Sequence, residues 1–300
     1  MIKLGHVVPV ENPYHLGAAE FAQKVAEKSK GRIEVKIFPN SQLGNERDLA
    51  EGLQLGTLQM AVTANAPLSR YAPRVLLFDL PFIFRDDDHW DKVVGGPLGK
   101  GLRDELTGKG LRPLAYWDGG WRGPYARRPI KSLDDIKGMK FRTMESPMHI
   151  SIYTALGARG VPMSSAEQYS ALQQGVVDGG DSPPVFYKQL KHYEVAKHLT
   201  LLPLFKLTVE LLVSEKFYSA LSPDLQRALQ EAADEATPSQ RRAQRELDQR
   251  IIDDLKKEGV QVYTVSAAER EKFTRAMAAV WKEYEDKVGK DKIQAVLETK

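Results

Sequence analysis

The chain has 300 residues, no cysteine and a formal net charge of +3, with 43 Lys and Arg residues against 40 Asp and Glu residues. This length is typical of about two domains, and the near balance of charge does not indicate a nucleic-acid-binding surface. The absence of cysteine excludes disulfides, thiolate nucleophiles, zinc–thiolate sites and iron–sulfur clusters. No apolar run approaches the roughly 18 residues of a membrane-spanning helix.

The chain begins with a strand, a helix and a second strand. Ile2 to Val8 is typical of a short buried strand, and Asn12 and Pro13 are the cap and first residue of a helix. Arg32 to Phe38 alternates polar and apolar side chains, as a half-covered strand does. This order predicts a parallel crossover. Since no secretory leader precedes the first strand, we expect either a cytosolic protein or one whose leader has been removed.

The alternation continues along the chain as an α/β pattern. The predicted elements are a helix striped by Leu49 and Leu53, a strand at 58–63, a helix at 97–106, strands at 111–117 and 140–143, a helix opened by the Ser164–Glu167 capping box, and strands at 199–202 and 207–213. Between them, Trp117 to Pro129 is rich in Gly, Trp, Arg and Pro, which indicates a crossing between two lobes.

A long helix follows these strands. It begins at Ser222 and Pro223, continues to Gly259 on one apolar stripe, and is predicted to kink at Pro238 because proline lacks an amide donor. A short strand at 261–265 and a last capped helix complete the chain. The pattern predicts residues 1–119 with 208–250 as one lobe and 120–207 with 251–300 as the other, with a ligand cleft between them.

Motifs of metal, phosphate and nucleophilic chemistry are absent. The run Asp86 to His89 is interpreted as a solvated loop in which Asp87 or Asp88 caps a helix, since consecutive side chains diverge and do not enclose one ion. Gly95 to Gly101 is one residue short of a P-loop, and Gly101 stands where Ser or Thr is required. Neither GxGxxG after the first strand nor GxSxG occurs, so no cofactor, metal or catalytic residue is predicted.

Arginines near aromatic side chains are the remaining chemical signal. Arg122 follows Trp121 in the predicted crossing, and Arg142 lies in the strand at 140–143. The planar guanidinium matches a carboxylate in a bidentate pair, so either residue could hold a small acid. For a single arginine, the alternative is a surface salt bridge or packing of its stem.

At these residues the sequence resembles the extracytoplasmic solute-binding proteins of tripartite ATP-independent periplasmic (TRAP) transporters. The matching segments are Gln42–Gly44, Leu80–Phe82, Ser132–Arg142, Ala155–Ala158, Tyr169–Gly179 and Tyr193–Val195. The resemblance implies two α/β lobes, a ligand cleft and a long helix across both lobes. It further implies a periplasmic binding protein, not an enzyme, that delivers an organic acid to the membrane subunits of a TRAP permease.

The resemblance also implies site residues. Arg142 matches the arginine that holds the ligand carboxylate, and Arg122 matches a second arginine of the cleft. Asp181 and Ser182 stand where members of the family commonly carry Glu and Asn, so the carboxylate would lose a contact or bind through water. The expected contacts from the first lobe are His6, Tyr14, His15, Glu46 and Asn65, and the expected walls are Trp121 and Phe186.

The identity of the acid is left open by these residues. Several polar candidates with aromatic walls favour a sugar acid, such as a uronate or an aldonate. Aromatic acids, keto acids and C4-dicarboxylates remain alternatives, although Glu46 would repel a second carboxylate. Two other functions also remain open: an enzyme that acts on a small carboxylic acid, and a sensor subunit that presents its ligand to a receptor.

Overall fold

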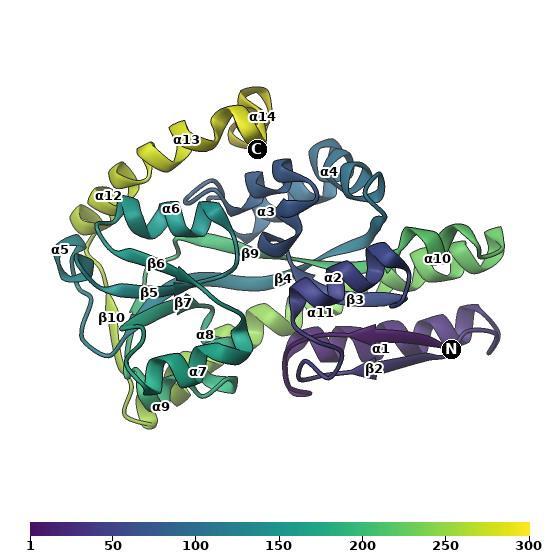
Figure 1. Cartoon of the computed structure of the whole chain (residues 1–300), viewed down its shortest axis with the longest axis horizontal. Helices are drawn as coiled ribbons and strands as arrows, with labels where there is room; N and C mark the ends of the chain where they lie inside the picture. Colours follow the sequence, from purple (N-terminus) through teal and green to yellow (C-terminus); the bar gives the residue numbers. More distant parts are fainter.

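The computed structural model describes residues Met1 to Lys300 (Figure 1). Its ten strands form one connected sheet. The first half-sheet has the order β2-β1-β3-β9-β4, and the second has β4-β7-β5-β6, with β8 paired to β4 and β10 paired to β8. The strands are β1 (Ile2–Gly5), β2 (Val35–Phe38), β3 (Met60–Ala64), β4 (Leu111–Ala126), β5 (Lys140–Thr143), β6 (Arg159–Pro162), β7 (Gly179–Ser182), β8 (His198–Leu201), β9 (Phe205–Ser214) and β10 (Gln261–Thr264).

Strand β4 makes the crossing between the two half-sheets. The sequence predicted a strand ending at Trp117 and a loop-like crossing to Pro129, and this is wrong, because β4 is a single strand of 16 residues. Its pairing with β9 shifts register between Asp118 and Trp121, and Gly120 there has φ 91°. The glycine allows the bulge, since a positive φ is unfavourable for other residues. The two lobes are therefore connected by one continuous strand, which stays paired with β9 and contains a bulge.

Helices cover both half-sheets. The helical segments are α1 (Pro13–Lys28), α2 (Glu46–Leu55), η1 (Ala66–Arg70), η2 (Pro73–Asp79), α3 (Asp87–Gly95), α4 (Pro97–Thr107), α5 (Leu133–Ile136), α6 (Pro147–Ala155), α7 (Ser165–Gln173), α8 (Pro184–Gln189), α9 (His192–Val195), α10 (Glu215–Ser219), α11 (Pro223–Lys257), α12 (Ala267–Ala276), α13 (Ala278–Val288) and α14 (Lys290–Glu298). None of them combines the length and the apolar character that crossing a bilayer requires.

Local signals placed most helix starts correctly. Asn12 caps α1 by accepting from the amide of Tyr14, and Ser164 with Glu167 forms the predicted capping box of α7. The predicted cap of α3, Asp87 or Asp88, is wrong by one or two residues, because Asp86 is the cap and accepts from the amide of His89. Consecutive aspartates offer the same capping chemistry, so sequence alone does not choose among them.

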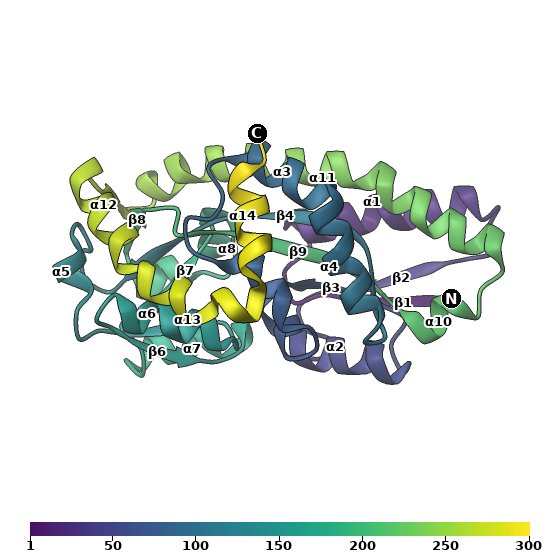
Figure 2. The same cartoon turned by 90° about the horizontal axis from the view of Figure 1, so that it is seen from above.

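Helix α11 is a 35-residue rod that spans the molecule (Figure 2). It packs on α1 and β4 in the first half and on α8 and β10 in the second. The helix is continuous through Pro238. The lobe boundaries predicted from sequence stay a prediction, since α13 contacts both η2 and α6 and therefore elements of both halves.

Candidate ligand-binding site

A small cavity lies between the half-sheets, at the carboxyl ends of β1, β3 and β7 and just beyond β5. Its volume is about 30 Å³, which is room for about two water molecules. The lobes are therefore closed around it. The lining residues are Val7, Val8, Tyr14, Glu46, Ala64, Arg122, Arg142, Met144, Ser165, Gln168, Ser182, Phe186, Leu190 and Leu207.

Arg142 is a buried cation without an ion-pair partner. Its side chain lines the cavity and is 5% exposed. Nε and Nη2 donate to the carbonyl oxygen of Met163 at 3.0 and 2.8 Å, and no carboxylate lies within 4.0 Å. Burial, together with the charge of Arg122, lowers the pKa of this guanidinium. A buried charge that no counter-charge neutralises is costly, so an anion at this position is strongly favoured.

Arg122 is buried in the same wall, but it is already paired. Its Nε binds the Asp181 carboxylate, and its Nη2 donates to the Asp181 carbonyl at 2.5 Å. The neighbouring charge of Asp181 raises the pKa of Arg122 despite the opposing effect of burial. Asp181 thus orients Arg122 and does not line the cavity itself. Ser182, the next residue along β7, does line it.

The opposite wall carries a carboxylate, and an aromatic pair joins the two walls. Glu46, at the start of α2, accepts from the amide of Ala64 at 2.7 Å and has no cation within 4.0 Å. Burial raises its pKa. Tyr14 from α1 meets Phe186 from α8 edge to face, with 5.2 Å between the ring centroids. Burial raises the pKa of the Tyr14 hydroxyl well above its usual value, so the hydroxyl stays neutral and can donate.

Three of the predicted first-lobe residues lie outside the cavity lining. His6 is buried, and its Nε2 lies 3.0 Å from Nδ1 of His15, so the two imidazoles bind each other. Burial lowers the pKa of His6 to about 4, which keeps it neutral. The Asn65 amide donates to the carbonyl of Val75 at 2.9 Å and is buried below the strand end.

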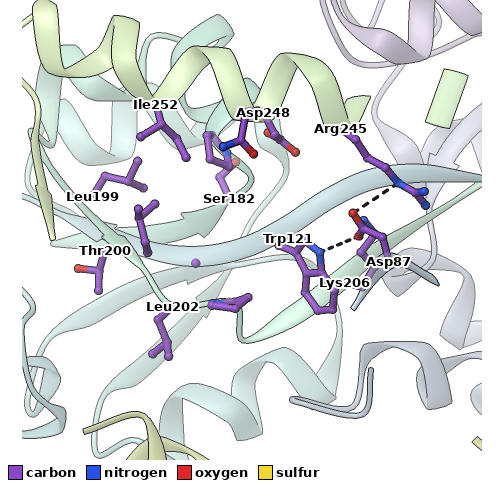
Figure 3. Close-up of a pocket in the computed structure, with 15 residues that line it drawn as sticks. Asp87, Trp121, Ser182, Leu199, Thr200, Leu202, Lys206, Arg245, Asp248 and Ile252 are labelled. Atoms are coloured by element: carbon purple, nitrogen blue, oxygen red, sulfur yellow. Dashed lines mark hydrogen bonds and ion pairs between the residues drawn. The ribbon is translucent and has the colours of Figure 1, made fainter. Parts of the chain in front are cut away.

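Trp121 lines a different pocket, on the side of α11 (Figure 3). This pocket has a volume of about 360 Å³. Trp121 donates from Nε1 to Asp87 at 2.8 Å, and Lys206 binds both Asp87 at 2.6 Å and Asp118 at 2.8 Å. The bulge in β4 turns Trp121 to this side, whereas Arg122 points into the cleft. Ser182 is shared by the two pockets.

Sequence reasoning missed several lining residues. Gln168 and Ser165 come from α7, Leu207 from β9, and Met144 follows β5. Gln168 is 2% exposed and donates from Nε2 to the hydroxyl of Tyr125. A glutamine on the buried face of an otherwise ordinary helix is a weak signal, and the others are apolar or small residues without a motif.

Comparison with known proteins identifies the family of the chain. Residues 4–287 match the model of the bacterial extracellular solute-binding proteins, family 7. The 2,3-diketo-L-gulonate-binding periplasmic protein YiaO of Escherichia coli is 35% identical over 88% of this chain and 80% of its own length. The chain belongs to family 7. This family is extracytoplasmic and serves TRAP transporters, and the TRAP permease subunits are the partners that it implies.

Solved members of this family share the whole architecture. The sugar acid binding protein DctPAm of Advenella mimigardefordensis, in complex with galactonate, superposes with a TM-score of 0.96 at 34% identity, covering 99% of this chain and 96% of that one. A TRAP solute-binding protein of Sulfurospirillum deleyianum with bound succinate gives 0.95 at 34% identity, covering 100% and 98%. Family 7 therefore includes both sugar-acid and dicarboxylate complexes on this fold.

Proposed function

We propose that this family 7 protein captures a hydroxylated monocarboxylic acid, of the aldonate or uronate class, and delivers it to a TRAP permease. The observation that carries the proposal is Arg142, a buried guanidinium with no carboxylate within 4.0 Å, which faces a cavity between the lobes. A ligand carboxylate would supply the missing counter-charge through charge-assisted hydrogen bonds. Ser182 and Gln168 stand near enough on the same lobe to add neutral contacts.

The far wall favours hydroxyls over a second carboxylate. Glu46 is the charged group of that wall, and an acceptor in a buried site pairs well with a ligand hydroxyl. A second carboxylate would meet like charge there, unless Glu46 took up a proton. Galactonate in the DctPAm complex is an acid of the favoured kind, whereas succinate in the Sulfurospirillum complex is the alternative.

Catalysis is not part of the proposal. The relatives are binding proteins, and the groups around the cavity suit holding a ligand better than activating one. Arg122 and Asp181 bind each other, and Tyr14 stays protonated because burial raises its pKa. Recovery of the acid unchanged after incubation is the expected result, and its conversion would favour the enzyme alternative.

A thermal-shift panel tests the proposed ligand class. The acids are galactonate, galacturonate, succinate, pyruvate and benzoate, with galactose as the neutral control. An acid at about 1,000 times its dissociation constant stabilises the fold by about 4 kcal/mol, which raises the melting temperature by several degrees. We expect galactonate or galacturonate to give the largest shift and galactose to give none. A larger shift with succinate would contradict the class, and a shift with galactose would contradict the role of the carboxylate.

A further inference from the structure

Side chains from opposite lobes meet on both sides of the ligand cavity. We propose that Gln189 with Asn12, and Arg47 with Glu145, form an interlobe clasp that determines how long the closed protein retains its ligand. Asn12 and Arg47 belong to the half with β1, and Glu145 and Gln189 belong to the half with β5 and β7. The inference rests on the proposed function, because it concerns the same cavity.

The first contact of the clasp joins the start of α1 to the end of α8. Gln189 Oε1 accepts from Asn12 Nδ2 at 2.8 Å, and Gln189 Nε2 donates to the carbonyl of Glu11 at 3.1 Å. One amide therefore makes two hydrogen bonds across the cleft. Asn12 is held in place for this contact, because its Oδ1 already caps α1 by accepting from Tyr14. The Asn12 side chain is therefore already oriented toward Gln189 before the lobes close.

The second contact lies at the mouth of the cleft. Arg47 Nη1 is 3.5 Å from Glu145 Oε1, and the two side chains are 52% and 32% exposed. A second, smaller cavity is lined by Glu46, Arg142 and Glu145, so the Glu145 side of this ion pair borders the space next to Arg142. An exposed pair of this kind is screened by salt.

Each clasp residue is close in sequence to a residue that lines the ligand cavity. Arg47 follows Glu46, Glu145 follows Met144, and Gln189 precedes Leu190. The edge-to-face contact of Tyr14 with Phe186 lies beside the amide contact and also joins the two lobes. Forming the clasp therefore brings the opposing walls together around whatever occupies the cavity. Breaking it is expected to speed dissociation more than it slows association.

Closure of the lobes can be measured directly with spin labels. The chain has no cysteine, so two introduced cysteines are the only thiols that the labels can modify. Glu51 on α2 and Ala166 on α7 are exposed and stand on opposite lobes. Glu51→Cys with Ala166→Cys carries two spin labels, whose separation is measured by pulsed electron paramagnetic resonance without ligand and with galactonate. The clasp variant is Arg47→Ala with Gln189→Ala.

Matched controls remove similar contacts within one lobe. Gln54 donates to the carbonyl of Lys109 at 3.1 Å, and Arg74 pairs with Glu105 at 3.1 Å. Gln54→Ala with Arg74→Ala therefore removes one glutamine and one arginine contact without touching the cleft. Asn12 is left unchanged in every variant, since its loss would also uncap α1.

Without ligand, we expect the clasp variant to show a larger fraction of long distances than the wild type, while the control variant matches the wild type. We expect the dissociation rate of galactonate from the clasp variant to rise about tenfold or more, because the variant loses the two hydrogen bonds of Gln189 and the exposed Arg47–Glu145 ion pair. The part due to Arg47 should vanish at about 1 M salt.

Equal distance distributions in the clasp variant and the wild type would overturn the proposal, as would an equal effect of the control variant. If galactonate and the other acids bind to none of the variants, the proposed function is wrong, yet the distances without ligand still decide whether the clasp holds the lobes together.

Discussion

Arg142 and Glu46 carry opposite charges on facing walls of one small cavity, and neither has a counter-ion. Arg122 differs, because Asp181 already neutralises it. At the scale of single residues, this arrangement separates two roles. Arg142 supplies attraction for any carboxylate, whereas Glu46 selects what stands at the other end of the ligand.

Glu46→Gln tests this selection. The amide keeps an oxygen that can accept from Ala64 but removes the charge that would repel a second carboxylate. We expect the affinity for succinate to rise relative to that for galactonate by about tenfold or more, since like charges in a desolvated contact cost several kcal/mol. Calorimetry on both ligands measures the ratio. Glu51→Gln, on the exposed face of α2, is the control, and an unchanged ratio in Glu46→Gln would contradict the role of Glu46.

Helix α11 and strand β4 both extend through the two lobes, and they meet at Gly120. A Cβ at Gly120 would meet the carboxylate of Asp248 and would lie 2.8 Å from Cβ of Pro183. Asp248 in turn accepts from the amide of Val185 at 3.1 Å and from Gln244 at 2.8 Å. The start of α8, and with it Phe186, is therefore positioned by α11.

Gly120→Ala is expected to destabilise the fold by about 2 kcal/mol or more, because the φ of 91° and the crowding both oppose a side chain. Gly138→Ala is the matched control, since Gly138 has φ 74° and no atom near its added Cβ, and it should cost only about 1 kcal/mol. Urea unfolding of both variants gives the two values. Equal losses would show that crowding at Gly120 is unimportant.

The raised pKa of Asp248 predicts how the free energy of unfolding depends on pH. Burial raises the pKa of Asp248 from 3.8 to about 7. Between these values the folded protein holds a proton that the unfolded chain has released, so the free energy of unfolding falls as the pH rises toward 7. Asp248→Asn removes this titration, and we expect its unfolding free energy to fall less than that of the wild type between pH 5 and about pH 8. Urea unfolding across this range measures both proteins. An equal change of the unfolding free energy with pH in the wild type and in Asp248→Asn would contradict the raised pKa of Asp248.

At the scale of the whole molecule, sequence patterns predicted the two-lobed α/β fold and the cleft, because caps, crossovers and stripes are local. The crossing was harder to predict, because the glycines and tryptophans of β4 are typical of a loop. Pairing with β9 nevertheless keeps these residues in the sheet. The bulge then decides that Arg122 faces the cleft and Trp121 faces α11. Gln168 and Leu207 reach the cavity only through packing between distant segments, which no local pattern encodes.

The most direct test of the account is the affinity of Arg142→Ala for galactonate, measured by calorimetry beside the wild type, Arg142→Lys and the exposed control Arg128→Ala. Each charge-assisted hydrogen bond to the carboxylate is worth about 1.5–3 kcal/mol, so loss of a two-pronged contact should weaken binding at least about a hundredfold. Lysine should restore only part of the affinity because it lacks the planar fork. Wild-type affinity in Arg142→Ala would contradict the assignment of Arg142 as the anchor of the ligand.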